Sequence, residues 1–327
     1  GALADRFPEV AAEPKELPEG EVEAVSGTGE TPSIDALFAL LVPAARTRDA
    51  KTGVRAVESL LGLGEEARDG GWPSQSEVAR RLGVNPAAVS HAIANARQRW
   101  LRTPPMTGLR EDIAALLEAQ GGMMVASELA EALLASRGSL QAERVRARQA
   151  LAVVRAAVET ERDRAAARWI VRRLHRGGQI LLARDELADD GSPVVDGEKL
   201  ADYAEALGKR ADELASEDPL RPPGRMLAAI QAVEPPPGVT RPAANRLHQL
   251  AAATSARAAL SSRLELYPRG MAAARAIKLA VGALSGAREL TPEQVRERVA
   301  GRYPEAEPLP DRPALSLIHI SEPTRLC

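Results

Sequence analysis

Apolar residues recur at helical spacing over most of the chain beyond Ser33. Intervals of three and four residues between apolar positions place them on one side of a helix. The pattern changes where two short apolar runs flank Gly177-Gly178, which predicts a β-hairpin. The sequence therefore predicts a mainly α fold with a small β-hairpin, and it places helices around residues 37–41, 54–61, 109–117, 129–134, 145–158 and 197–215.

The most specific local pattern runs from Trp72 to Trp100 and reads WPSQSEVARRLGVNPAAVSHAIANARQRW. Ser74 followed by Glu77 is a capping box, in which each side chain accepts a hydrogen bond from an otherwise unpaired backbone N–H at a helix start. Gly83 predicts the end of that helix, because glycine readily adopts the left-handed backbone of a helix C-terminus. Asn85, a good N-cap, predicts that a second helix starts at once.

The apolar positions of these two predicted helices face one another. Val89 and Ile93 of the second helix are expected to pack on Val78 and Leu82 of the first. Two short helices joined by a glycine turn, with this inward pattern, predict a helix-turn-helix. The alternative is a helical pair in a bundle, or a helix-turn-helix retained for protein contacts.

DNA binding is the functional hypothesis for this motif, because the second helix of a helix-turn-helix enters the major groove. Residues 72–102 carry five bases and one acid. The arginines expected to reach phosphates are Arg80, Arg81, Arg97, Arg99 and Arg102. The positions expected to face the bases are Asn85, Ala87, Ser90, His91 and Asn95. None of these is arginine, which makes the commonest specific contact with guanine, so nonspecific binding with weak base readout is predicted.

The three helices expected between residues 109 and 158, followed by the hairpin, have the layout of a winged helix. Residues 137–184 hold twelve arginines against four acids, a net charge of +8. Arg172, Arg173 and Arg176 are expected on or beside the wing, where phosphate contact is one hypothesis. A solvated arginine-rich face or a protein interface is the alternative.

The net charge of the chain changes from positive to negative after residue 184. Residues 185–234 hold thirteen acids and five bases, and one hypothesis is that this stretch screens the basic wing. Residues 271–285 predict another helix, and a capping box at Thr291 predicts one more over residues 292–301. These two helices repeat the opening of the winged helix, which predicts a second copy that is cut short.

Six segments follow from these patterns. The first residue, Gly1, is not an initiator methionine, which predicts a fragment, and the last twelve residues, SLIHISEPTRLC, resemble a translated sequencing adapter. The predicted segments are an acidic disordered linker (1–32), a helix-turn-helix domain (33–105), a winged-helix-like domain (106–184), an acidic helical connector (185–260), a truncated second winged-helix-like domain (261–315) and an adapter-derived scar (316–327).

Composition excludes several classes of protein. The net charge of -2 is a sum over blocks of opposite sign, so it does not exclude a nucleic-acid partner. The single cysteine, Cys327, excludes a disulfide framework and a cysteine-rich zinc site. No apolar run reaches the roughly 18 residues of a membrane span, and no signal peptide begins the chain, so a cytoplasmic protein is predicted. A phosphate loop, a paired-histidine metal motif and the kinase HRD and DFG motifs are missing, which predicts no catalytic residue, no metal ligand and no small-molecule substrate.

Two resemblances to known families add to this interpretation. The stretch from Arg55 to Arg99, with EVARRLGV followed by VS and a basic helix end, resembles a sigma factor region 4. The longer run from Ser33 to Leu315 resembles the C-terminal, noncatalytic region of the serine/threonine kinase of the BREX and phage growth limitation defence systems. The stretches that carry it are WPSQSEVARRLGV, RWLRTPPMTGLR, GGQILLARDELADDGSPVVDGEKLADYAEALGKRADELA, SSRLELYPRGM and VRERVAGRYPEAEPLPDRPAL.

The second resemblance implies phosphorylation that depends on ATP and Mg, carried out by a domain outside this chain, with other phage-defence proteins as partners. None of the kinase residues of that family can be assigned here. The functional hypothesis is a DNA-binding regulatory region of a defence kinase, with duplex DNA as partner. The alternative is a docking scaffold for the kinase substrate or other defence components, without DNA binding.

Overall fold

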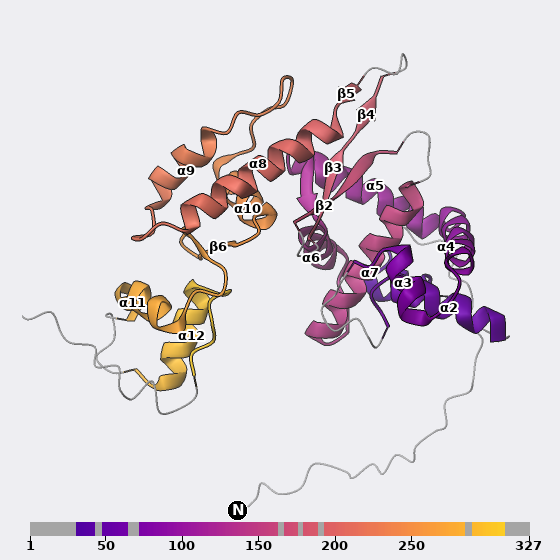
Figure 1. Cartoon of the computed structure of the whole chain (residues 1–327), viewed down its shortest axis with the longest axis horizontal. Coiled ribbons are helices and arrows are strands. Elements are labelled where there is room, and N and C mark those ends of the chain that lie inside the picture. Colours follow the sequence, from indigo (N-terminus) through magenta and orange to yellow (C-terminus); the bar gives the residue numbers. More distant parts are fainter. Residues whose placement is uncertain are drawn as a thin grey trace, which may run out of the picture. The chain divides into compact units, whose positions relative to one another are not determined.

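The computed structural model describes residues 31–42, 48–64, 72–162, 167–175, 179–188, 193–284 and 290–310 (Figure 1). The chain divides into a unit of residues 1–31 and a unit of residues 32–327, and the helices and strands of the described residues lie in the second. The described residues form twelve helices and seven short strands. The predicted mainly α fold with a small hairpin is confirmed. The predicted linker up to residue 30, Arg176 and residues 311–327 lie outside the described residues.

The helices are α1 (Ile34–Ala39), α2 (Arg48–Leu60), α3 (Gln75–Leu82), α4 (Pro86–Leu101), α5 (Pro104–Ala119), α6 (Ala126–Arg137), α7 (Glu143–Glu161), α8 (Gly197–Ala215), α9 (Pro223–Gln231), α10 (Ala244–Thr254), α11 (Ala273–Leu284) and α12 (Pro292–Arg302). The strands are β1 (Met123–Val125), β2 (Trp169–Leu174), β3 (Gln179–Arg184), β4 (Glu186–Leu187), β5 (Pro193–Val195), β6 (Ala258–Leu260) and β7 (Leu266–Pro268). Each helix that the sequence predicts is present within this set.

The local signals around α3 and α4 act as the sequence predicts. Ser74 Oγ accepts a hydrogen bond from Glu77 N at 3.2 Å, and Ser74 N donates to Glu77 Oε2 at 2.6 Å. Gly83 ends α3 in the left-handed conformation, with φ of 63°. Asn85 Oδ1 then accepts from Ala87 N at 2.9 Å, which caps α4. Short-range hydrogen bonds thus fix both ends of the turn between the two helices.

A separate small core joins α2 to α3 and α4. Val78 and Ala79 of α3 pack with Val89 and Ile93 of α4, and Leu82 lies beside them, so the predicted inward pattern is confirmed. Figure 1 shows the three helices together. Ile93 is fully buried, which fixes the rotation of α4 about its axis. The opposite side of α4 is therefore the exposed one.

The winged-helix layout contains a strand that the sequence pattern missed. Elements run in the order α5, β1, α6, α7, β2, β3, and the strands form an antiparallel sheet in the order β1, β3, β2. The predicted hairpin is confirmed, with Trp169 opposite Arg184 and Leu174 opposite Gln179. The unpredicted β1 pairs with β3 through Met124 and Leu182. A three-residue strand is too short for its alternation to stand out from the helices around it.

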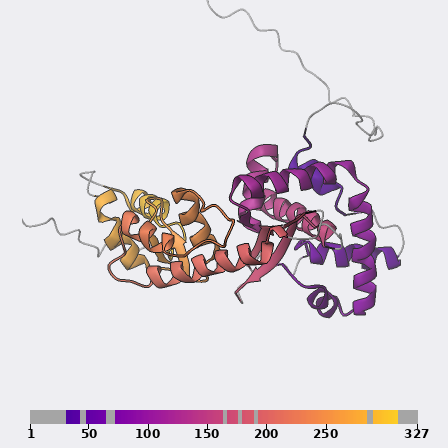
Figure 2. The same cartoon turned by 90° about the horizontal axis from the view of Figure 1, so that it is seen from above.

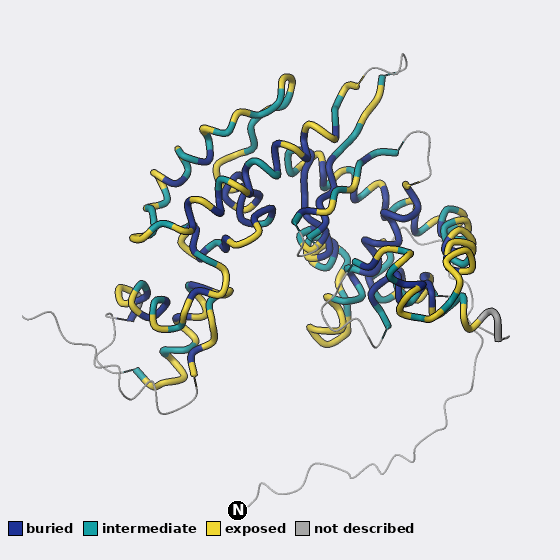
Figure 3. Tube along the Cα trace, viewed as in Figure 1, coloured by how far each residue is buried: buried dark blue, intermediate teal, exposed yellow. Residues whose placement is uncertain are grey.

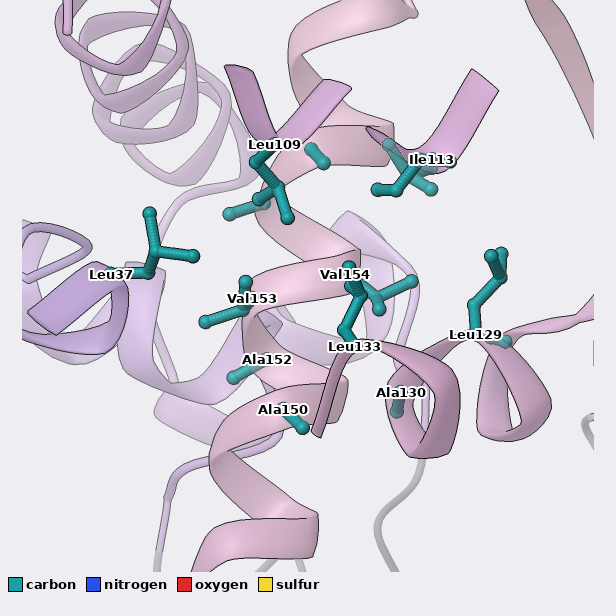
Figure 4. Packing of buried hydrophobic residues seen from close by; sticks show 14 of the residues in the cluster. Leu37, Leu109, Ile113, Leu129, Ala130, Leu133, Ala150, Ala152, Val153 and Val154 are labelled. Carbon is teal, nitrogen blue, oxygen red and sulfur yellow. The ribbon is translucent and has the colours of Figure 1, made fainter. Parts of the chain in front are cut away.

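Helix α7 passes through the largest core. It packs against α1, α4, α5 and α6, and from residue 152 to residue 161 each of its residues is buried. Figure 4 shows Val153 and Val154 of α7 among Leu37, Leu109 and Leu133 of neighbouring helices. A helix that is buried all round cannot present a face to solvent along that length.

Both faces of the three-stranded sheet are covered. Ile180 and Leu182 of β3 point into the core around α7, while Leu181 and Ala183 point into a second core under α8 and α10. Successive side chains of a strand point to opposite faces, so this apolar run has cover on both sides. Figures 1 and 2 show α8 starting beside the sheet. The stretch predicted as a helical connector is therefore a packed layer.

Helices α8 and α10 cross at a glycine. A Cβ atom on Gly208 of α8 would lie 2.6 Å from the carbonyl carbon of Thr254 and closer still to its oxygen. The hydroxyl of Thr254 lies 2.8 Å from Ala204 O of α8 and 2.7 Å from Leu250 O of its own helix, and the contact with Ala204 ties the two helices together. Only a residue without a side chain leaves space for this approach.

Asp212, one turn further along α8, anchors the chain that follows α10. Its carboxylate accepts hydrogen bonds from Ser255 Oγ at 2.6 Å, Arg257 N at 2.7 Å and Ala258 N at 3.1 Å. Burial alone would raise the pKa of Asp212, but the hydrogen bonds from Ser255 and the backbone outweigh it and lower that pKa. The ionised carboxylate is thus part of the folded structure.

We expect an Asp212→Asn variant to unfold more easily at pH 7, by about 1 to 3 kcal/mol, because buried backbone donors lose a charged acceptor. A carboxylate whose pKa is lower in the folded state stabilises that state at pH values above the pKa of the unfolded state. This stabilisation is lost as the pH falls through the pKa of the folded state. The difference between Asp212→Asn and the unaltered chain should therefore shrink below about pH 4. Urea unfolding at pH 7 and pH 3 measures it, and a constant difference would contradict the assignment.

The C-terminal elements form a third core around α11 and α12. Tyr267 of β7 and Tyr303 pack edge to face, with ring centroids 5.0 Å apart. Thr291 and Gln294 form the predicted capping box at the start of α12. The second winged-helix copy remains a prediction, since residues 285–289 and the stretch after residue 310 lie outside the described residues. Throughout the described ranges, every helix is too short or too polar to cross a membrane.

Candidate nucleic-acid interface

The outer face of α4 carries the side chains predicted to meet the bases. Ala87, Ser90, His91 and Asn95 are exposed, and the N-cap Asn85 is exposed beside them. They follow intervals of three and four residues, so they share one side of the helix. In Figure 3 the tube of α4 alternates between exposed residues, drawn in yellow, and less exposed ones. The structure therefore brings the predicted set together on one surface.

Hydrogen bonds hold several of these side chains. Ser90 Oγ donates to Gln75 Oε1 of α3 at 3.1 Å. Asn95 Nδ2 and His91 Nδ1 lie 3.3 Å apart on adjacent turns. Asn85 uses its carbonyl oxygen for the helix cap, and its amide group keeps two donors. The face thus presents polar side chains, several of which are held in place by hydrogen bonds.

Three of the predicted phosphate contacts lie on exposed positions around this face. Arg80 and Arg81 occupy the last turn of α3, and Arg102 follows α4 directly. Among the described residues, none of the three forms an ion pair. Arg99 differs, because it is half-buried and Arg99 Nη2 donates to Leu41 O at 2.8 Å. Burial lowers the pKa of Arg99. Its hydrogen bond ties α4 to the segment that follows α1, so Arg99 is as much a structural contact as a surface cation.

Arg97 lies on the other side of α4 from the exposed face. Its guanidinium pairs with Glu159 of α7, with Arg97 Nε 3.1 Å from Glu159 Oε2. The side chain of Arg97 is 11% exposed and that of Glu159 is 3% exposed. This pair fastens α4 to the central helix, so Arg97 does not extend the exposed arginine group.

Glu159 serves more than one arginine. Arg155 Nη2 lies 3.7 Å from Glu159 Oε1, and Arg162 Nη1 lies 3.8 Å from the same oxygen. Arg155 also donates to Pro73 O at 2.6 Å, and its guanidinium lies 4.5 Å from the ring centroid of Trp72. The C-terminal half of α7 is therefore joined to the segment that leads into α3.

The wing arginines are engaged within the fold. Arg172 pairs with Glu198 and Asp202 of α8 and lies 3.8 Å from Glu205. Arg173, on the opposite face of β2, donates to Trp72 O. The acidic stretch thus covers the Arg172 side of the wing. This agrees with the hypothesis that the stretch screens the basic wing. Arg176 lies outside the described residues.

Other arginines, both in the basic block and in α5, also join elements. Arg148 donates to the carbonyl oxygens of Gly62 and Gly64 at 2.9 and 2.8 Å. Arg110 of α5 pairs with Glu161 at 2.6 Å, and Arg168 lies 3.2 Å from the same carboxylate. Sequence reasoning missed these roles. The sequence did contain a signal of buried ion pairs, namely charged residues within the apolar helical run of residues 150–161. Charged groups are rarely buried unless they are paired.

The chain is similar to part of a protein named Probable kinase PglW from Streptomyces coelicolor (strain ATCC BAA-471 / A3(2) / M145), with 36% identity over 294 residues. The match covers 84% of this chain and 19% of that protein, so the chain spans about a fifth of the length of the relative it matches. No protein-family model and no solved structure matches the chain. The resemblance to a kinase polypeptide is thereby supported, and this chain corresponds to a limited region of one.

Proposed function

We propose that this chain is the DNA-binding region of a bacterial antiphage defence kinase, and that it holds duplex DNA through α3 and α4. The observation that carries the proposal is the exposed polar face of α4, with Arg80, Arg81 and Arg102 exposed beside it. The second helix of such a pair enters the major groove, and flanking arginines contact phosphates.

The proposal gives this role to α4 in preference to α7. In the winged-helix layout α7 follows the turn after α6, but residues 152–161 of α7 are buried among other helices. Arg172 and Arg173 have partners on α8 and at Trp72. Only the first turns of α7, with Arg144 and Arg146, are exposed. DNA contact through α3 and α4 therefore requires no rearrangement, whereas contact through the body of α7 would.

Nonspecific binding is the mode that fits the face. Phosphate contacts supply affinity without sequence information, and Ser90, His91 and Asn95 offer a small number of donors and acceptors for base edges. The kinase activity belongs to the proposed parent protein. Among the described residues, no group of three or more histidine, cysteine, aspartate or glutamate side chains is placed to hold a metal ion.

We expect the Arg80→Gln/Arg81→Gln double variant to bind a duplex about tenfold more weakly, or worse, near 100 mM salt. The slope of the logarithm of the binding constant against the logarithm of the salt concentration should also become shallower by about two, because each phosphate contact releases counterions. Fluorescence anisotropy with a labelled duplex between about 50 and 200 mM salt measures both quantities. The matched control is Arg144→Gln/Arg146→Gln, which removes the same charge from exposed positions of α7 and should leave affinity unchanged. Binding that is absent or insensitive to salt would contradict the proposal.

Protein docking is the second candidate function. Leu140, between α6 and α7, is 98% exposed, and the hairpin of β4 and β5 exposes Leu187 and Val194. Large apolar side chains at exposed positions favour contact with another protein. If docking is the function in place of DNA binding, the Arg80→Gln/Arg81→Gln variant will match the unaltered chain in every duplex titration.

A further inference from the structure

A cavity of about 730 Å³ lies where the start of α3, the end of α7 and the strand β2 meet. This volume falls in the range of small-molecule sites. The side chains that decide its chemistry are those of Trp72, Arg155, Arg162, Trp169 and Arg173, with Glu159 at one side. No residue of α4 lines the cavity, although Gln75 at its edge accepts a hydrogen bond from Ser90 of the exposed α4 face.

Arg155 is the central feature of this cavity. It is 3% exposed, and its Nη2 donates to Pro73 O. Its Nε and Nη1 atoms are buried and have no hydrogen-bond acceptor among the described residues. Buried polar groups are normally paired, and a charged donor without an acceptor costs more free energy than a neutral one. The Arg155 guanidinium, which lines the cavity, therefore carries N–H donors that have no acceptor within the described part of the chain.

Trp169 adds a second donor of the same kind. Its Nε1 atom is buried and has no acceptor among the described residues, and the residue lines the same cavity. The unpaired buried atoms of Arg155 and Trp169 are all N–H groups, which only donate. A molecule that satisfies them must bring acceptor atoms.

The charges around the cavity favour an anion as that molecule. Arg97, Arg155 and Arg162 share the single carboxylate of Glu159, and Glu161 is paired with Arg110 and Arg168. Arg162 and Arg173 line the cavity in addition to Arg155. Burial lowers the pKa of Arg155 to about 9, so its cationic form is disfavoured and a nearby negative charge would stabilise it.

We propose that this cavity binds a small phosphate-bearing molecule, whose oxygens accept hydrogen bonds from Arg155, Arg162 and Trp169. Guanidinium groups bind phosphate through several hydrogen bonds, because more than one phosphate oxygen can accept at once. Val158, Ile170 and Ile180 supply an apolar wall for the organic part of the ligand.

Tryptophan fluorescence of the full chain tests the proposal, because Trp72 and Trp169 line the cavity and Trp100 is buried elsewhere. The probes are inorganic phosphate, adenosine 5′-monophosphate and adenosine, with calorimetry as a second measurement. We expect saturable binding of phosphate and of the monophosphate, and none of adenosine at equal concentration. Adenosine that binds as tightly as the monophosphate, or no binding of any probe at about 10 mM, would overturn the proposal.

Variants locate the binding. Arg155→Lys keeps the charge and loses donors, and should weaken phosphate binding about tenfold or more. Arg162→Gln, at a side chain that is 62% exposed, should weaken it about threefold and remains informative if Arg155→Lys does not fold. Arg144→Gln removes an exposed arginine from the other end of α7 and serves as the control. Equal affinities across these variants would overturn the assignment.

Two further measurements separate this site from the proposed DNA interface. The Arg80→Gln/Arg81→Gln variant should keep its full affinity for adenosine 5′-monophosphate, whatever happens to its duplex binding. A duplex that displaces the monophosphate competitively from the unaltered chain would show that the cavity receives a DNA phosphate, and this result would overturn the small-molecule proposal.

Discussion

A Gly208→Ala variant is expected to unfold at a lower urea concentration, with a loss of about 2 kcal/mol in the free energy of unfolding. Alanine inside a helix is ordinarily better than glycine by nearly 1 kcal/mol, so helix propensity alone predicts the opposite sign. At Gly208 the added methyl group would overlap the backbone of Thr254, and a backbone cannot turn aside as a flexible side chain can. Circular dichroism during urea unfolding measures the difference.

Gly108 provides the matched control. It lies inside α5, and a Cβ atom placed there would meet no atom within 4 Å. Gly108→Ala should therefore raise the free energy of unfolding by about 0.5 to 1 kcal/mol. Equal effects of the two substitutions would show that α8 and α10 do not approach as closely as the structure places them.

A larger loss is expected from Glu159→Gln, about 3 kcal/mol or more in the free energy of unfolding. The substitution keeps the size of the side chain and removes its charge. Arg97 and Arg155 then lose a carboxylate in a site where both are largely buried, and an uncompensated buried charge is costly. Urea unfolding at pH 7 measures the loss, which should be accompanied by altered Trp72 fluorescence, because Arg155 lies over that ring.

Glu118→Gln is the control for this second prediction. Glu118 Oε1 lies 3.4 Å from Arg184 Nη1, but its side chain is 68% exposed. Exposed ion pairs contribute little, so the free energy of unfolding should fall by less than about 1 kcal/mol. A loss at Glu159 no greater than the loss at Glu118 would mean that the buried arginines have other compensation.

The sequence predicts the features that depend on interactions between near neighbours in the chain. It misses those that depend on residues far apart along the chain. The ends of α3 and α4 depend on hydrogen bonds between residues three apart or fewer, such as Ser74 with Glu77, and these leave a readable pattern. Strand β1 depends on pairing with β3, far along the chain, and a three-residue segment carries no period of its own. The exposed face of α4 could be predicted because both its caps and its buried positions are local.

The same limit applies to the prediction of functional residues, as the arginines show. Their number and their position in blocks are evident from the sequence, but their partners are not. Arg97 and Glu159 are separated by 62 residues, and Arg172 meets acids of a helix that follows the sheet. Of the predicted phosphate contacts, Arg80, Arg81 and Arg102 keep exposed positions, whereas Arg97, Arg172 and Arg173 act within the fold. A basic block and an acidic block in one chain therefore indicate ion pairs within the fold as readily as they indicate a nucleic-acid surface.

The covered sheet also has a consequence for the order of events during synthesis. A nascent chain that has emerged as far as β3 can complete the core around α7, but Leu181 and Ala183 still face water on the other side. Their cover arrives with α8 and α10, which the ribosome makes later. Exposed apolar surface on a growing chain is open to aggregation and to chaperones until it is buried. The interval between β3 and the end of α10 is thus when the emerging polypeptide is most vulnerable, and pausing there would prolong it.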